Sequence, residues 1–235
     1  MPQSFAFERR SSCEDSSFNE VASTEMVRGI AVFDLDGTLL RGDTVCELLA
    51  RPLARLPEMK RFERLTEEAE IANARKQMAL WYDGVSVETL HSYLDDAIWA
   101  PGAREAIREL QRGNILVAIA SITWRFAVGW FASQLSVRHY LGTDINEDGS
   151  IAHVWPRDKA RWLNELVRDY EVSSNQVAAI GDSWGDTDML MAAHLSFFVG
   201  HTPLPGLSSA IHLPHGDLRA ISKRILDAWH PDRFA

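Results

Sequence analysis

The feature that most constrains this fold is a short apolar run that ends in two aspartates and a glycine. Residues 29–33 read Gly-Ile-Ala-Val-Phe, and the turn that follows contains Asp34, Asp36 and Gly37. An apolar run of this length before a turn is typical of a strand buried on both faces. Because desolvating a carboxylate is costly, two carboxylates at such a point indicate a compensating cation or hydrogen bonds. A pair like this can hold a hard metal ion, or supply a nucleophile and a proton donor.

Short apolar segments alternate with helical patterns along most of the chain. This alternation predicts an α/β fold with a Rossmann-like parallel sheet, flanked by helices and joined by right-handed crossovers. The expected strands are residues 30–33, 115–120 (stopping at Ser121), 140–145, 151–154, 177–180 and 195–199. The expected helices of this sheet are residues 103–111, 125–135, 158–170, 186–193 and 218–229.

A long helical segment follows the first strand. Between Thr44 and Ile98 apolar residues recur at helical spacing, with breaks near Pro52, Pro57 and Asp83-Gly84 and with no strand signal. A helical block inserted at this point predicts a small cap. We therefore expect a disordered N-terminal arm over residues 1–25, a core domain over residues 26–40 and 100–235, and a helical cap domain over residues 41–99.

The composition argues against several classes of protein. Asp and Glu number 33 against 24 Lys and Arg, and no basic stripe is present, so nucleic-acid binding is not expected. No apolar run approaches the roughly 20 residues of a membrane span. The only cysteines are Cys13 and Cys46, so we expect no disulfide framework and a reducing, cytoplasmic location.

Polar residues follow three of the expected strands at their carboxyl ends. Ligands of open parallel sheets bind at this edge, so these side chains are expected to lie close together. The residues are Asp34 and Asp36, Ser121 and Asp182, joined by Lys159 and Asp186 at the starts of two helices that are expected to reach the same edge.

These motifs give the chain a clear resemblance to a known family. Over residues 29–200 it resembles the haloacid-dehalogenase-like (HAD) hydrolase superfamily, and within it the phosphoserine-phosphatase-like branch, whose helical cap follows the first strand. Residues 34–38 match the first motif and residues 181–190 the fourth, and both motifs are specific. Ser121 and Lys159 fit the second and third motifs by their order and context.

The resemblance implies a Mg²⁺-dependent phosphatase that forms an aspartyl-phosphate on a small phosphorylated metabolite. Asp34 would attack phosphorus, and the Asp36 side chain would protonate the leaving alcohol and then deprotonate water. Mg²⁺ would be held by Asp34, the Asp36 main-chain carbonyl and Asp182.

The other motif residues are implied to support this reaction. Lys159 and Ser121 would bind phosphoryl oxygens, and Asp186 would orient Lys159 or support the metal site. Taken singly, each motif residue also fits an ordinary structural role, such as a turn, a strand end, a solvated lysine or a helix cap. Their joint order along one sheet edge favours the functional interpretation.

Other functions remain open on the sequence. A phosphotransferase or mutase would use the same intermediate, a dehalogenase of the superfamily typically lacks the second aspartate, and a non-catalytic binding protein normally shows a broken motif. Residues 181–185 also match the nucleophile elbow of serine hydrolases, with Ser183 as the nucleophile. Its available partners are Asp217 and His212, His215 or His230, but no His-Gly-Gly segment supplies an oxyanion hole.

Residues of the expected cap indicate a substrate class. The resemblance implies that Asp43 contacts a substrate amino group and that Arg75 binds a carboxylate, so the substrate would be phosphoserine or another amino-acid phosphate. Two departures from the branch touch the phosphate pocket: Ile122-Thr123 stands where Gly-Gly is usual, and Gly185 where Asn is usual.

Two tryptophans flank the motifs. Trp124 follows the second motif and Trp184 lies inside the fourth. One of them could line the pocket and favour an aromatic, sugar or nucleoside-like substrate, or both could pack between helix and sheet.

Overall fold

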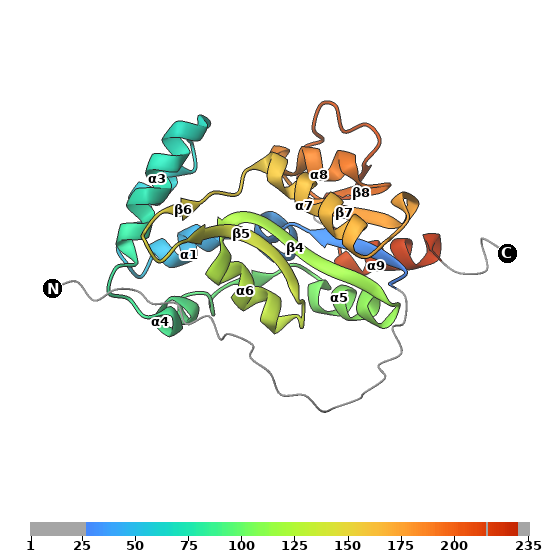
Figure 1. Cartoon of the computed structure of the whole chain (residues 1–235), viewed down its shortest axis with the longest axis horizontal. Coiled ribbons are helices and arrows are strands. Elements are labelled where there is room, and N and C mark those ends of the chain that lie inside the picture. The colour runs from blue at the N-terminus through green and yellow to red at the C-terminus, as the bar shows by residue number, and fades with distance from the viewer. Residues whose placement is uncertain (1–26, 215, 230–235) are drawn as a thin grey trace.

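The protein is organised around one central sheet. The structure, a computed structural model, describes residues 27–214 and 216–229, so the arm expected over residues 1–25 lies outside it. Within the described residues, a seven-stranded sheet has the order β6-β5-β4-β1-β7-β8-β9. The β5–β6 pair is antiparallel and the other neighbours are parallel. The predicted α/β fold with a mostly parallel sheet is therefore confirmed (Figure 1).

Strands and helices mostly alternate along the chain after a helical block. The strands are β1 (Gly29–Phe33), β4 (Ile115–Trp124), β5 (His139–Ile145), β6 (Ile151–Ala152), β7 (Val177–Gly181), β8 (Leu195–Phe198) and β9 (Ile211–His212), and a separate pair is formed by β2 (Leu40–Arg41) and β3 (Ile98–Trp99). The helices are α1 (Val45–Ala50), α2 (Leu56–Phe62), α3 (Glu68–Trp81), α4 (Val87–Ser92), α5 (Ala103–Arg112), α6 (Arg125–Gln134), α7 (Pro156–Asp169), α8 (Thr187–Ala192) and α9 (Leu218–Ala228). In the described part of the chain, none of the helices combines the length and apolarity that crossing a membrane requires.

Helices cover both faces of the sheet. Helices α5, α6 and α9 lie on one face and α7 and α8 on the other (Figure 1). Successive side chains of a strand point to opposite faces, so Ala31 and Phe33 of β1 pack toward the first group, and Ile30 and Val32 toward the second. All four side chains are fully buried, which explains why β1 is apolar throughout rather than alternating.

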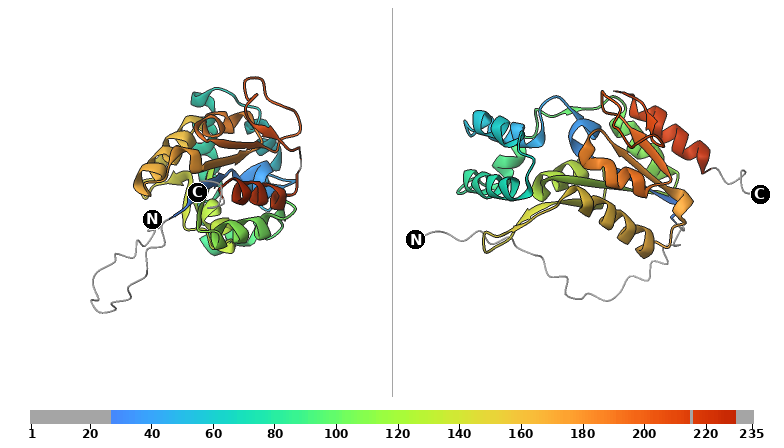
Figure 2. Two further views of the ribbon diagram at one scale, coloured as in Figure 1. Left: turned by 90° about the vertical axis from the view of Figure 1, so that its right-hand side faces the viewer. Right: turned by 90° about the horizontal axis from the view of Figure 1, so that it is seen from above.

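Helices α1–α4 gather at one end of the molecule, and α9 lies toward the other (Figures 1 and 2). The chain enters this block through β2 and leaves it through β3, and these two strands pair antiparallel. The block is fixed to the body by buried side chains that join the main core, including Met59, Met78 and Leu90. The predicted helical insertion is therefore present, and its division from the core as a separate cap domain stays a prediction.

Several sequence-based boundaries were wrong. Strand β4 does not stop at Ser121 but runs to Trp124, because β5 pairs with it beyond a register shift that sets Trp124 opposite Thr143. Ile98 belongs to β3 and not to a helix, and an unpredicted break separates α2 from α3. Pro57 lies inside the first turn of α2, where a missing N–H has no cost. The expected strand over residues 151–154 keeps only two residues, and β9 is too short for its pattern to be recognised.

Candidate active site

The turn after β1 brings the first motif against the fourth. The Asp34 N–H donates to the Ile180 carbonyl of β7 at 2.9 Å, which extends the sheet pairing into the turn. Gly37 has φ of +77°, and a Cβ at this position would overlap the Asp182 carboxylate. Only glycine combines this backbone conformation with so close an approach. The glycine of the motif therefore allows the turn to lie directly beside Asp182.

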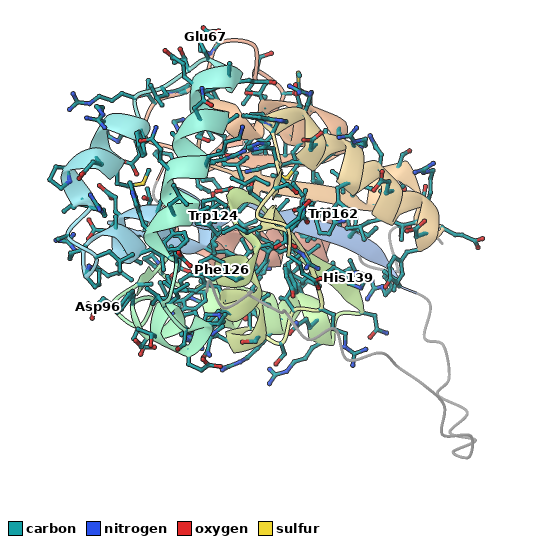
Figure 3. The ribbon with its side chains drawn as sticks, turned by 60° about the vertical axis from the view of Figure 1, so that its left-hand side comes forward. Glu67, Asp96, Trp124, Phe126, His139 and Trp162 are labelled. Atoms are coloured by element: carbon teal, nitrogen blue, oxygen red, sulfur yellow. The ribbon has the colours of Figure 1, made fainter. Side chains whose placement is uncertain are left out.

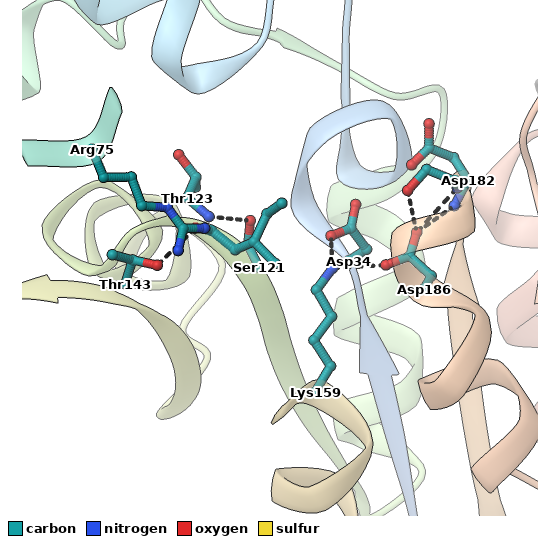
Figure 4. A network of polar contacts seen from close by, with 10 residues as sticks. Asp34, Arg75, Ser121, Thr123, Thr143, Lys159, Asp182 and Asp186 are labelled. Atoms are coloured by element: carbon teal, nitrogen blue, oxygen red, sulfur yellow. Dashed lines mark hydrogen bonds and ion pairs between the residues drawn. The ribbon is translucent and has the colours of Figure 1, made fainter. Parts of the chain in front are cut away.

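Lys159 joins the first motif to the fourth by two buried ion pairs. Its Nζ lies 2.6 Å from Asp34 Oδ1 and 2.7 Å from Asp186 Oδ1, and all three side chains are almost completely buried (Figure 4). Burial alone would lower the pKa of Lys159, but Asp186 and Asp34 outweigh it and raise the pKa above its ordinary value. The lysine is therefore a fixed positive charge beside the Asp34 carboxylate.

Asp186 organises the loop that carries Asp182. Its second oxygen, Oδ2, accepts hydrogen bonds from the Asp182 N–H, the Ser183 N–H and the Ser183 hydroxyl, each at 3.1 Å. With Oδ1 bonded to Lys159, both carboxylate oxygens of Asp186 are used inside the protein. Asp186 thus holds Lys159 and the Asp182 loop in place, and its supporting role in a reaction stays a prediction.

Three carboxylates meet at this point. Ligand atoms of Asp34, Asp182 and Asp186 all lie within 4.8 Å of one another. Burial, and then the charge of Asp186, raises the pKa of Asp182 to about 6. Burial and Asp186 likewise raise the pKa of Asp34, although Lys159 opposes them. Asp34 and Asp186 are paired with Lys159 and Asp182 adds a third carboxylate, and this surplus of oxygen ligands and negative charge fits a hard divalent cation such as Mg²⁺.

Asp36 lies two residues after Asp34 and is hydrogen-bonded to the first helix of the helical block. Its Oδ1 accepts the N–H of Val45, the first residue of α1, at 2.7 Å. Burial raises the pKa of Asp36 to about 7, although the bond from Val45 works against the rise. A carboxyl group in this range can both give and take a proton near neutral pH.

A cavity of about 300 Å³ opens between the sheet edge and the helical block. Four of the predicted site residues line its polar side: Asp34, Asp36, Ser121 and Lys159. Ser121 is buried, and its hydroxyl oxygen accepts the N–H of Thr123 at 3.2 Å. The cavity also takes lining residues from α2, α3 and the end of β4. The sheet edge thus brings together residues far apart in the chain, such as Asp34 and Lys159, which are separated by 125 positions.

Asp43 and Arg75, the predicted substrate contacts, are placed differently from each other. Asp43 lies outside the cavity lining, on the surface, where it pairs with Arg51. Arg75 lines the cavity and is buried, but its Nη2 donates to the carbonyls of Ile122 and Val154 at 3.0 and 3.1 Å. The contact of either residue with a substrate stays a prediction, and the Asp43 placement does not favour it.

The bonds of Arg75 predict a structural role that can be measured. Replacing Arg75 with methionine should lower the free energy of unfolding by about 1–3 kcal/mol, because it removes a buried donor from two carbonyls. Urea denaturation followed by circular dichroism would measure the change. Arg64→Met, on an exposed side chain in the loop before α3, is the matched control and should change stability by less than about 0.5 kcal/mol. Equal stabilities for the two variants would contradict the role.

Arg41 is a residue of the site that the sequence analysis missed. Its Nη1 donates to the Gly37 carbonyl, to the Thr38 carbonyl at 2.9 Å and to the Leu40 carbonyl at 3.2 Å. These bonds hold the turn that carries Asp36. The position of Arg41 close after the first motif could have indicated a role in the site. A single arginine in the sequence, however, does not show that its side chain will bond to the carbonyls of the preceding turn.

The contacts of Ser183 do not assemble a serine-hydrolase site. Its hydroxyl donates to Asp186, whereas His212 Nε2 lies 2.9 Å from the Gly200 carbonyl and Asp217 caps α9 and pairs with Arg219. The other two histidines named as partners, His215 and His230, lie outside the described residues.

A comparison with known protein families agrees with the motifs that form this site. Residues 31–191 match the haloacid dehalogenase-like hydrolase family, which is more than half of the chain. The chain belongs to the haloacid dehalogenase-like hydrolase family, as its motifs predicted.

Several similar proteins are phosphoserine phosphatases. A phosphoserine phosphatase of Mycobacterium tuberculosis is 27% identical over 186 residues, which are 74% of this chain and 44% of that protein. A phosphoserine phosphatase of Archaeoglobus fulgidus is 24% identical over 208 residues, which are 79% of this chain and 60% of that protein. The chain thus spans less than two thirds of the length of these two relatives. A solved structure of a phospho-aspartyl intermediate analogue of phosphoserine phosphatase matches with a TM-score of 0.68 at 20% identity. The match covers 83% of this chain and 98% of the solved chain, and it supports the fold.

Proposed function

We propose that this protein is a Mg²⁺-dependent phosphomonoesterase that acts through an aspartyl-phosphate on Asp34. The observation that carries the proposal is the position of the Asp34 carboxylate, which lines the cavity while it is paired with Lys159 at 2.6 Å. The names of the similar proteins and the family membership support the same activity. We also propose a cytoplasmic location, on the cysteine content alone.

In the first half of the reaction a phosphoryl group passes to Asp34. A carboxylate oxygen of Asp34 forms a bond to phosphorus while the bond from phosphorus to the leaving alcohol oxygen breaks. Asp36 gives its proton to that oxygen, so the product leaves as a neutral alcohol. Lys159 and the Ser121 hydroxyl stabilise the charge on the phosphoryl oxygens.

In the second half water releases the phosphate. Asp36, now ionised, takes a proton from a water molecule. The oxygen of that water forms a bond to phosphorus while the bond from phosphorus to Asp34 breaks. Inorganic phosphate leaves and both aspartates return to their starting states. Asp34 and Asp182 would hold Mg²⁺, with Asp186 in support, and the ion would supply the positive charge that lets an anion approach a phosphate.

The metal requirement is a direct test. Phosphate release from phenyl phosphate should depend on Mg²⁺ and stop when a chelator is added. Mg²⁺ at about 100 times its Kd should also stabilise the protein by about 2.7 kcal/mol, which raises the Tm of a chain of this size by roughly 5–11 °C. Calorimetry with and without Mg²⁺ would measure the shift independently of activity.

Two variants make this test specific. Asp182→Asn should lose most of the Mg²⁺-induced rise in Tm, because it removes one carboxylate of the cluster. Asp188→Asn alters an exposed aspartate of the same motif and should keep the rise. If both variants kept it, the proposed metal site would be wrong.

A further inference from the structure

The cavity has a second, apolar side that the reaction does not use. Helices α2 and α3 and the loop between them contribute Met59, Phe62, Leu65, Ile71, Ala74 and Met78, and the end of β4 contributes Ile122 and Trp124. Trp124 is buried and lies edge-on to Tyr82 at the end of α3 (Figure 3). Trp184 is 66% exposed and does not line the cavity. The part of a substrate that lies beyond its phosphate would therefore meet hydrocarbon.

The ionisable groups in this part of the cavity are already engaged. Arg75 donates to the Ile122 and Val154 carbonyls, its Nη1 lies 3.2 Å from His153 Nδ1, and its guanidinium stacks 4.8 Å above the Trp155 ring. The other lining cation, Lys159, is bonded to two carboxylates. To bind a substrate carboxylate through Nη2, Arg75 would have to give up these two carbonyls, and a buried carbonyl left without its donor is costly.

Matching the ammonium group of an amino acid would be equally difficult. Asp43, the predicted contact, is on the surface with Arg51. Glu63 lines the cavity as an exposed residue, and one of its carboxylate oxygens accepts the Thr44 hydroxyl at 2.8 Å. An ammonium group paired with it would therefore lie toward solvent and not among the apolar side chains. Burial raises the pKa of the Cys46 thiol to about 12, so this lining group is uncharged near pH 7 and cannot pair with an ammonium group.

We infer that the substrate is the phosphate monoester of an uncharged alcohol with an apolar body, and not an amino-acid phosphate. The inference rests on the proposed function, because the apolar side continues directly from Asp34, Asp36 and Ser121. The phosphate occupies the polar side, and the carbon chain or ring of the alcohol lies among Phe62, Ile71 and Trp124. A volume of about 300 Å³ is at the small end of the range for ligand pockets, so the alcohol is of metabolite size.

A homologous series of substrates tests this inference on the full chain with Mg²⁺. Phosphate release is measured from ethyl, butyl and hexyl phosphate, whose leaving alcohols have similar chemistry, and from O-phosphoserine. The kcat/KM should rise about fourfold for each methylene until the cavity is filled. Hexyl phosphate should exceed O-phosphoserine by at least tenfold.

The results separate the inference from the proposed function. Faster hydrolysis of O-phosphoserine than of each alkyl phosphate, or no dependence on chain length, would overturn the inference and leave the phosphatase proposal intact. No release from any of the four esters would overturn the proposed function, and the inference with it.

A pair of variants on α3 tests where the alkyl chain of the substrate binds. Ile71→Ser places a hydroxyl on the cavity wall and should reduce the ratio of kcat/KM for hexyl and ethyl phosphate by about fivefold or more. Leu80→Ser, on the same helix but 74% exposed and outside the lining, should leave that ratio unchanged. An unchanged ratio in the folded Ile71 variant would place the apolar part of the substrate elsewhere and overturn the inference.

Discussion

Replacing Asp34 with asparagine is expected to lower the turnover of phenyl phosphate by on the order of 10⁴-fold or more. Asparagine is nearly isosteric and can still accept a hydrogen bond from Lys159, which now lies 2.6 Å from Asp34 Oδ1. It removes the negative charge and the nucleophilic oxygen, so no acyl-phosphate can form. Steady-state phosphate release, with circular dichroism to verify folding, measures the effect.

The control makes the same Asp→Asn substitution at a position away from the site. Asp169→Asn alters an exposed aspartate at the end of α7 and should leave turnover within about twofold of the unchanged protein. If folded Asp34→Asn retained a tenth or more of the activity, a nucleophile other than Asp34 would be required. Incubation with substrate and an acid quench gives a second readout, since the unchanged protein and Asp169→Asn, but not Asp34→Asn, should carry acid-stable, hydroxylamine-sensitive phosphate.

The second large effect is expected on stability. Lys159→Met should lower the free energy of unfolding by about 3–5 kcal/mol, because it leaves Asp34 and Asp186 buried without their shared positive charge. Urea denaturation in the presence of a chelator measures the ion pairs without any contribution from a metal. The same substitution removes a charge next to the phosphoryl group, so activity should fall with stability.

Two further variants identify the cause of this loss. Lys223→Met removes an exposed lysine that pairs with Asp227 across one helical turn, and should change stability by less than about 0.5 kcal/mol. The double variant Lys159→Met/Asp186→Asn should be more stable than Lys159→Met alone, because one of the two uncompensated charges is gone. A double variant no more stable than the single one would show that lost packing, and not charge, dominates.

The residues at the carboxyl end of the sheet could be predicted well from the sequence because local patterns fix them. A strand that is buried on both faces must be apolar throughout, so β1 and β7 are visible as short runs, and whatever polar residue follows them lies at the same edge. Asp34 and Asp182 were located in this way, and Gly37 marked the turn that follows the first strand. The structure adds the reason for the glycine, which is the contact with the Asp182 carboxylate.

The positions of Asp43 and Arg75 could not be predicted in the same way. Each was assigned by its place in a motif pattern, and each finds its partners through the packing of the helical block. Arg51 lies eight residues from Asp43 and competes for it on the surface. The carbonyls that hold Arg75 belong to residues 47 and 79 positions away, at the end of β4 and after β6. No local pattern shows that these carbonyls need a donor.

By itself, the sequence determined the class of fold, the buried strand before the first motif and the identity of the residues at its carboxyl end. These depend on periodicity of two or 3.6 residues and on the cost of burying charge, which act over a few neighbouring residues. Only the tertiary structure decided which side of the cavity is polar and which is apolar. An apolar residue on a helix, such as Phe62 or Ile71, has the same pattern whether it fills a core or faces a ligand, and only the packing of α2 and α3 over the sheet edge distinguishes the two.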